Sequence, residues 1–136
     1  GLALDLSQGL ALGAELKGTG AVGLTGTATA ATYNTGTGAG TCVRVDASKQ
    51  SWVSIGSLNA LYTYKATIAN TGSVELSIRT ATSGGTVLAT IAASATVDVY
   101  FYGNATCVIT ASAAGTAAFT ISAFQHIAGN LIIFPV

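Results

Sequence analysis

One histidine and two cysteines are the residues of this chain best suited to nucleophilic or acid–base chemistry. His126 lies in the run FQHIAG, far in the sequence from both Cys42 and Cys107. A Ser-His-Asp or Cys-His scheme needs a histidine that contacts its nucleophile, so every such scheme here would depend on His126. A lone histidine at the end of an apolar strand is more often structural or exposed. We therefore predict no catalytic residues and no enzyme.

The acidic residues offer no closely spaced pair of the kind that glycoside hydrolysis uses. The chain has no CxxC, no HxxxH, no aspartate-rich loop and no glycine-rich stretch that leads into a basic residue and a helix. We expect no metal, no cofactor and no nucleotide site. The carboxylates are scattered along the chain at Asp5, Glu15, Asp46, Glu75 and Asp98.

The two cysteines can be compared by strand parity. Cys42 alternates in phase with Arg44, whereas Cys107 alternates in phase with Ile109, so the two thiols are predicted to point to different sides of the sheet. This favours two free, buried thiols, with a single disulfide as the alternative.

The charge content excludes several classes of partner. The chain carries five basic and five acidic residues, 7% of the sequence against about 25% in typical soluble domains, and its formal net charge is zero. This argues against nucleic acid and against an anionic membrane surface as partners. No apolar run is long enough for a transmembrane helix. Little net charge keeps copies apart, so the composition favours an assembly that contains copies of this chain.

Short alternating runs separated by turn residues follow one another from residue 41. The clearest is VELSIRT, residues 74–80, which predicts a half-buried strand. Because the runs recur at roughly ten-residue spacing, we predict an all-β antiparallel β-sandwich, jelly-roll-like, with about eight strands. We assign residues 21–136 to this single domain and residues 1–20 to an extended N-terminal arm.

Four local features carry further predictions. In CVRVD, residues 42–46, the valines mark one face of a strand, and Trp52 is predicted in the core. The dipeptide Gly103-Asn104 predicts a tight hairpin. Residues 18–41 hold many small side chains, which favours a loosely paired edge or a surface loop, with a strand packed against a neighbouring chain as the alternative.

Tyrosines provide a possible exposed aromatic face. Tyr100 and Tyr102 lie on the polar side of the run TVDVYFY, and Tyr62 and Tyr64 share a side of another run. Exposed tyrosines stack on sugar rings and are also enriched at protein interfaces. A subunit contact or a second core face is the favoured interpretation, and a glycan-binding face is the alternative.

The N-terminal segment alternates like a strand. Leucines recur on even positions, while glycine, alanine, aspartate, serine and glutamate occupy the odd ones. Gly9 and Gly13 would each cost a helix about 1 kcal/mol, so an extended arm is favoured over a helix. We predict that this arm pairs with a neighbouring subunit through one apolar edge. Its leucines are Leu2, Leu4, Leu6, Leu10, Leu12 and Leu16.

Residues 64–111 resemble a pattern of small structural proteins of tailed bacteriophages. The likeness lies in NTGS after a strand, in SGGTVLATIAA and in TVDVYFYGN. It implies a β-sandwich virion protein of the capsid decoration, tail or fibre type, with copies of itself and other virion proteins as partners. We expect a non-enzymatic subunit that decorates or stabilises a capsid in the virion. The alternatives are an extracellular filament assembled by strand donation and a carbohydrate-binding module.

Overall fold

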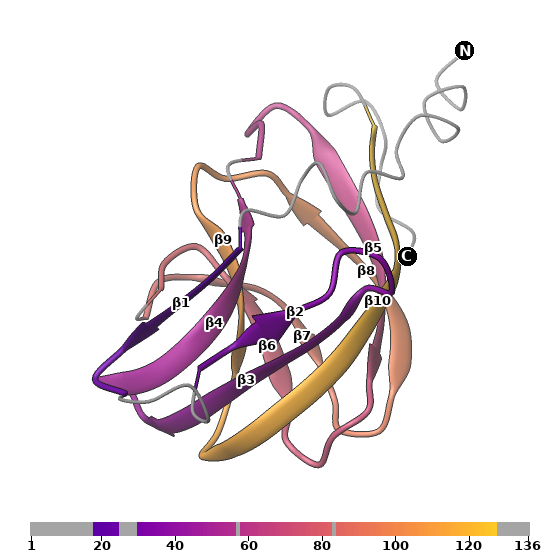
Figure 1. Ribbon diagram of the computed structural model, residues 1–136. Coiled ribbons are helices and arrows are strands. Elements are labelled where there is room, and N and C mark those ends of the chain that lie inside the picture. Colours follow the sequence, from indigo (N-terminus) through magenta and orange to yellow (C-terminus); the bar gives the residue numbers. More distant parts are fainter. Residues whose placement is uncertain (1–17, 25–29, 57, 83, 128–136) are drawn as a thin grey trace.

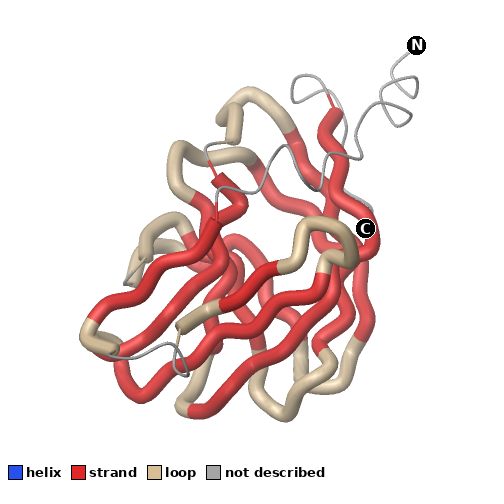
Figure 2. Tube along the Cα trace, in the orientation of Figure 1, coloured by secondary structure: helices blue, strands red, loops and turns tan. Residues whose placement is uncertain are grey.

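Strands and loops make up the described part of the chain, and no helix occurs in it (Figure 2). The computed structural model describes residues 18–24, 30–56, 58–82 and 84–127. The predicted all-β antiparallel class is confirmed. The strands are β1 (Gly18–Val22), β2 (Thr32–Tyr33), β3 (Ala39–Asp46), β4 (Lys49–Gly56), β5 (Thr63–Asn70), β6 (Leu76–Arg79), β7 (Val87–Ile91), β8 (Thr96–Tyr102), β9 (Cys107–Ala111) and β10 (Gly115–Ile127).

Eight of these strands, β3 to β10, pair in a nested order, as the two arms of one long hairpin would if the hairpin were rolled up (Figure 1). β3 pairs with β10, β4 with β9, β5 with β8 and β6 with β7, all antiparallel. Rolling also brings β10 beside β5 and β9 beside β6, which gives the order β7-β6-β9-β4-β3-β10-β5-β8. This nested pairing is the jelly-roll arrangement. The jelly-roll-like sandwich predicted from the spacing of the runs is confirmed.

Aromatic rings from three adjacent strands form the centre of the core on one side. Tyr64 of β5 stacks on Phe124 of β10 at a centroid distance of 5.6 Å and on Phe101 of β8 at 6.1 Å. All three are at most 3% exposed. Each such pair contributes about 0.5–1.5 kcal/mol beyond the burial of its area. The alternation in TVDVYFY therefore identified the inward face of β8.

The strand in VELSIRT is buried more deeply than the half-buried strand predicted. Leu76 and Ile78 face the core, but Ser77 on the opposite face is also only 1% exposed. Ser77 shares a hydrogen bond with the hydroxyl of Ser112. A small hydroxyl with a partner is buried at little cost. The alternation thus identified the two faces of this strand, but it did not reveal that the outer face is also buried.

The inward face of β3 is the opposite of the one its valines predicted. Cys42 is fully buried, whereas Val45 is 54% exposed and Val43 is part-buried. Cysteine packs as a small hydrophobe, so the Cys42 face belongs to the core. A register shift between Arg44 and Asp46 then places Val45 at a bulge near the β3–β4 turn.

β1 and β2 are edge strands, in agreement with the edge interpretation of residues 18–41. β1 pairs with β4, and β2 pairs with the first residues of β3 (Figure 1). Gly20 lies opposite Trp52, and a Cβ at Gly20 would lie 2.6 Å from the indole ring. Trp52 is therefore on the outer face of β4, and its predicted place in the core is wrong. The bare glycine gives the large ring room to cover β1.

The dipeptide Gly103-Asn104 does not form a tight hairpin, because β8 and β9 do not pair with each other. The segment instead crosses between strands in different parts of the sheet. The Gly103 amide donates to the Tyr62 carbonyl, and the Leu58 amide donates to the Asn104 carbonyl. A Cβ at Gly103 would lie 2.0 Å from the Asn59 carbonyl oxygen, so close packing explains this glycine.

Candidate functional site

The histidine and the two cysteines lie on three different strands: His126 on β10, Cys42 on β3 and Cys107 on β9. His126 is a residue of β10 and pairs in register with Tyr64. Asp98 accepts a hydrogen bond from the Thr67 hydroxyl at 2.7 Å and lies 3.8 Å from the Lys65 ammonium. Within the described ranges, no three His, Cys, Asp or Glu side chains come close enough together to hold a metal ion. The same ranges contain no helix of the length and apolarity needed to cross a membrane.

A second described carboxylate, Asp46, stabilises a turn. Its Oδ1 accepts hydrogen bonds from the amide and the hydroxyl of Ser48, both at 2.9 Å. These bonds, the hydroxyl first, lower the pKa of Asp46. The carboxylate is thus engaged in closing the β3–β4 hairpin.

Both cysteines are free and buried in the same core. The prediction of free thiols is confirmed, and the prediction that the thiols face different sides is wrong, because Cys42 faces inward. Burial raises the pKa of Cys42 to about 12 and that of Cys107 to about 11. Since thiolates are the reactive form, neither cysteine is suited to nucleophilic chemistry.

Tyr100 and Tyr102 lie on the outward face of β8, as predicted. Tyr102 is 49% exposed, and Tyr100 is part-buried with the Lys65 ammonium 5.9 Å from its ring centroid. Tyr62 and Tyr64 do not extend this face, since Tyr64 is in the core and its hydroxyl accepts a hydrogen bond from the Asn59 amide. Among the described residues, Tyr102 is the one aromatic side chain that is largely exposed.

The predicted interface leucines, Leu2, Leu4, Leu6, Leu10, Leu12 and Leu16, lie outside the described residues. The described chain begins at Gly18, the first residue of β1. That strand begins inside the span of residues 1–20 assigned to the arm.

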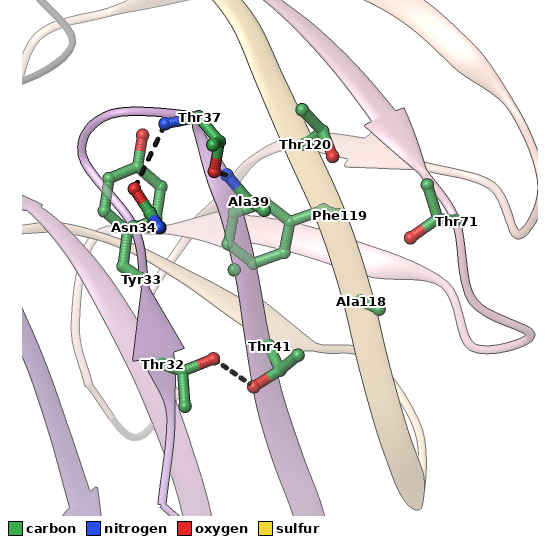
Figure 3. A pocket seen from close by; sticks show the side chains of 11 residues that line it. Thr32, Tyr33, Asn34, Thr37, Ala39, Thr41, Thr71, Ala118, Phe119 and Thr120 are labelled. Carbon is green, nitrogen blue, oxygen red and sulfur yellow. Dashed lines mark hydrogen bonds between the residues drawn. The ribbon is translucent and has the colours of Figure 1, made fainter.

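A depression of about 390 Å³ on the outer side of β2, β3 and β10 was not predicted from the sequence (Figure 3). Five threonines line it, together with small residues such as Ala39 and Ala118. The Thr71 amide donates to the Ala118 carbonyl, which holds the 71–75 loop against β10. The lining residues are Thr32, Tyr33, Asn34, Thr37, Ala39, Gly40, Thr41, Thr71, Ala118, Phe119 and Thr120.

Several polar groups of this depression already have partners. The Thr32 and Thr41 hydroxyls hydrogen-bond each other at 2.6 Å, and Asn34 Oδ1 accepts from the Gly36 and Thr37 amides. The Tyr33 hydroxyl is the exception: it is buried and has no hydrogen-bond partner among the described residues, and burial raises its pKa. The depression is uncharged and presents mainly hydroxyl and methyl groups.

Comparison with known proteins identifies no relative: no family model, no curated protein and no solved structure matches the chain.

Proposed function

We propose that this protein is a non-enzymatic structural subunit of a bacteriophage virion, one that decorates or stabilises the capsid through contacts between β-sheets. Its partners are copies of itself and other virion proteins. The observation that carries the proposal is the outer face of β3, β10, β5 and β8.

Threonine and alanine form cross-strand rows over part of this face. One row runs Ala39, Thr120, Ala69, Thr96 across four strands. We call the surface the threonine–alanine face; its residues are Ala39, Thr41, Thr67, Ala69, Thr96, Thr116, Ala118 and Thr120.

Covering this face costs little electrostatic free energy. Burying an unpaired charge is expensive, and even a paired charge loses its hydration. The eight residues named are uncharged, and the two charged side chains on the same side of β5 and β8, Lys65 and Asp98, pair with each other at 3.8 Å. The short side chains of this face also lose little rotamer freedom when covered. A second sheet or a capsid surface can therefore pack against it closely.

The test is to determine whether the chain is a component of purified phage particles. Mass spectrometry of density-gradient particles from the source culture is expected to find the chain at a fixed ratio to the major capsid protein. Its absence from the particles would overturn the proposal. In a particle-binding assay, Ala118→Lys is expected to reduce incorporation at least tenfold, because it puts a charge at the centre of the face.

The matched control is Ala113→Lys, which puts the same charge on an exposed loop residue between β9 and β10. It is expected to incorporate normally. Equal loss for both variants would show that net charge, rather than the threonine–alanine face, governs incorporation.

Carbohydrate binding is the second candidate function, and the depression in Figure 3 favours it. A volume of about 390 Å³ lies within the range of small-ligand sites, and an uncharged lining of hydroxyl and methyl groups matches a neutral sugar. Titration with neutral glycans by NMR is expected to shift the amides of Thr71 and Ala118. Shifts at Tyr100 and Tyr102 instead would place the site on the aromatic strand, and an absence of shifts would exclude this candidate.

A further inference from the structure

Two opposite charges lie on the outer side of β6. This strand belongs to the half of the sandwich formed by β7, β6, β9 and β4, whereas the threonine–alanine face lies on the other half. Leu76 and Ile78 are fully buried in the core, so strand alternation places Glu75, Ser77 and Arg79 on the outer side. Glu75 and Arg79 are four residues apart, a spacing of about 13 Å between their Cα atoms.

Neither charge has an ion-pair partner within the described ranges, where the salt bridge is Lys65–Asp98. Glu75 is exposed, and its backbone carbonyl accepts a hydrogen bond from the Ser112 amide, which fixes it beside β9. The Glu75 carboxylate therefore points away from the core at a defined position of the sheet.

The Arg79 guanidinium also has an unsatisfied donor. Its Nε–H is buried and has no hydrogen-bond partner among the described residues, although the residue as a whole is only part-buried. A buried donor without an acceptor lowers stability, and most buried polar groups in proteins have a partner. The missing partner is an acceptor, and carboxylates form the strongest hydrogen bonds with guanidinium groups.

The neighbouring positions on β7 are small or apolar. In its ladder with β6, Thr90 lies opposite Ser77, and Val87, which is 43% exposed, lies opposite Arg79. Ala92 follows the last residue of β7 and is also exposed. These side chains add no further charge to the surface around β6.

This arrangement is complementary to itself under a two-fold rotation. When a second copy packs its β6 face to face and antiparallel on the first, with the axis at Ser77, Glu75 of each copy faces Arg79 of the other. The same rotation places the exposed Val87 of each copy against Ala92 of the other. Two-fold contacts of this kind use one surface patch twice and close after two copies.

We propose that two copies of this chain form a two-fold dimer through the outer faces of β6 and β7, held by reciprocal Glu75–Arg79 ion pairs. The inference rests on the proposed function, which brings copies together on one particle. The threonine–alanine face, on the other half of the sandwich, stays available for the capsid. Because two short strands make a small interface, the isolated dimer is weak, and a high local concentration on a particle raises its occupancy.

Sedimentation equilibrium of the full chain at concentrations up to about 1 mM tests the dimer. The unmodified chain is expected to associate reversibly. Glu75→Arg and Arg79→Glu, each alone, place like charges at both ion-pair positions and are expected to weaken association at least tenfold. Because Glu75 is exposed, Glu75→Arg is expected to fold normally and provides the test even where Arg79→Glu is destabilised. A monomeric unmodified chain, or unchanged association of Glu75→Arg, would overturn the proposal.

Exchanging the charges separates the ion pairs from other effects of the substitutions. The double variant Glu75→Arg, Arg79→Glu restores both pairs with their signs exchanged, and it is expected to recover the association. An equimolar mixture of the two single variants is expected to form heterodimers, because each ion-pair position then joins opposite charges. If neither the double variant nor the mixture recovers association, the two charges do not face each other and the proposal is wrong.

A mixture of Glu75→Arg with Lys65→Glu is the matched control. Its two components carry the same net charges as the complementary mixture, but Lys65 lies on β5, in the other half of the sandwich. It is expected to form no more dimer than either component alone. Heterodimers at the level of the complementary mixture would show that net charge drives the association, against the proposal.

Failure of this inference is distinguishable from failure of the proposed function. A chain that is present in phage particles but does not respond to the Glu75 and Arg79 substitutions contradicts the dimer alone. A chain that forms the charge-dependent dimer but is absent from particles contradicts the virion role alone.

Discussion

The two margins of this sandwich differ in how they treat exposed strand edges. At the β3–β4 margin the hairpin joins the strands directly, and β1 and β2 cover what remains of both edges. At the opposite margin, a short turn connects β7 to β8, and no ladder joins these two strands within the described residues. The difference teaches that strand pairing closes one margin, whereas hydrogen bonds from Asn70 to the Ile91 and Ala95 carbonyls hold the other.

The largest loss of stability is expected from Asn70→Ala, which removes three hydrogen bonds beside the turn between β7 and β8. The Asn70 amide nitrogen donates to the Val74 and Ile91 carbonyls at 2.8 and 3.1 Å, and its oxygen accepts from the Gly72 amide at 3.0 Å. Asn70 is 2% exposed. Losing these bonds is expected to lower the free energy of unfolding by about 3 kcal/mol in urea denaturation.

Asn34→Ala is the control for Asn70→Ala, because the Asn34 side chain also hydrogen-bonds to backbone groups but lies in an exposed turn. It is expected to cost less than about 1 kcal/mol. Equal losses for the two variants would show that the margin near Asn70 is not held by this side chain.

At the covered margin, Gly20→Val is expected to displace β1. A Cβ at Gly20 lies 2.6 Å from the Trp52 ring, so β1 or the indole has to move. We expect a loss of about 2 kcal/mol and faster hydrogen exchange in β1 and the adjoining part of β4. Ala21→Val, at an exposed neighbouring position, serves as the control. Unchanged exchange in β1 would show that Trp52 does not position the covering strand.

The two buried thiols, Cys42 and Cys107, are expected to make the free energy of unfolding decrease at alkaline pH. Their folded pKa values, about 12 and 11, lie above the ordinary value of 9.0. The folded state therefore holds these protons more tightly, and the stabilisation is complete below pH 9 and declines as pH rises toward 11 to 12. Between pH 8 and 10 we expect a decrease of roughly 1 kcal/mol for each thiol. The Cys42→Ala, Cys107→Ala double variant should lack this decrease; an identical pH profile would contradict the prediction.

The smallest effect is expected from Thr110→Val in β9, midway between the margins. The Thr110 hydroxyl is buried and has no hydrogen-bond partner among the described residues. Replacing it with a methyl group of similar shape is expected to leave the free energy of unfolding unchanged or to raise it by less than about 1 kcal/mol. Ser77→Ala breaks the bond to Ser112 and should destabilise by about 1 kcal/mol. Destabilisation by Thr110→Val would indicate that the hydroxyl has a partner.

Sequence alternation predicted the fold wherever the two faces of a strand differ in chemistry. The faces of β8 were predicted correctly, since Phe101 and Asp98 could not exchange places without burying a carboxylate. The inward face of β3 was predicted incorrectly, because Cys42 and its neighbour Val43 are both compatible with a core. Pairing partners and the connection at Gly103 depend on residues distant in sequence, so no local pattern specified them.

The candidate surfaces were less predictable than the fold. The depression near Tyr33 arises because β2, β3, β10 and the loop at Thr71 converge, and each contributes only small or hydroxylated side chains. No local signal marks such a surface in a chain where threonine is common. The positions of β7 and β8 at the two ends of the strand order are likewise known only from the structure, whereas the leucine alternation in residues 2–6 is visible in the sequence alone.

The nested pairing also determines when the molecule can fold. β3 pairs locally with β4, but its ladder with β10 and both ladders of β5 can form only after residues 96–127 have been synthesised. Such a high contact order slows folding, because the entropy of closing long loops is lost before the contacts form. The complete sandwich can therefore form only once β10 is available, and the inward apolar faces of β3 and β5 lack their final neighbours until then. Apolar surface that is exposed during this interval favours association between incompletely folded copies.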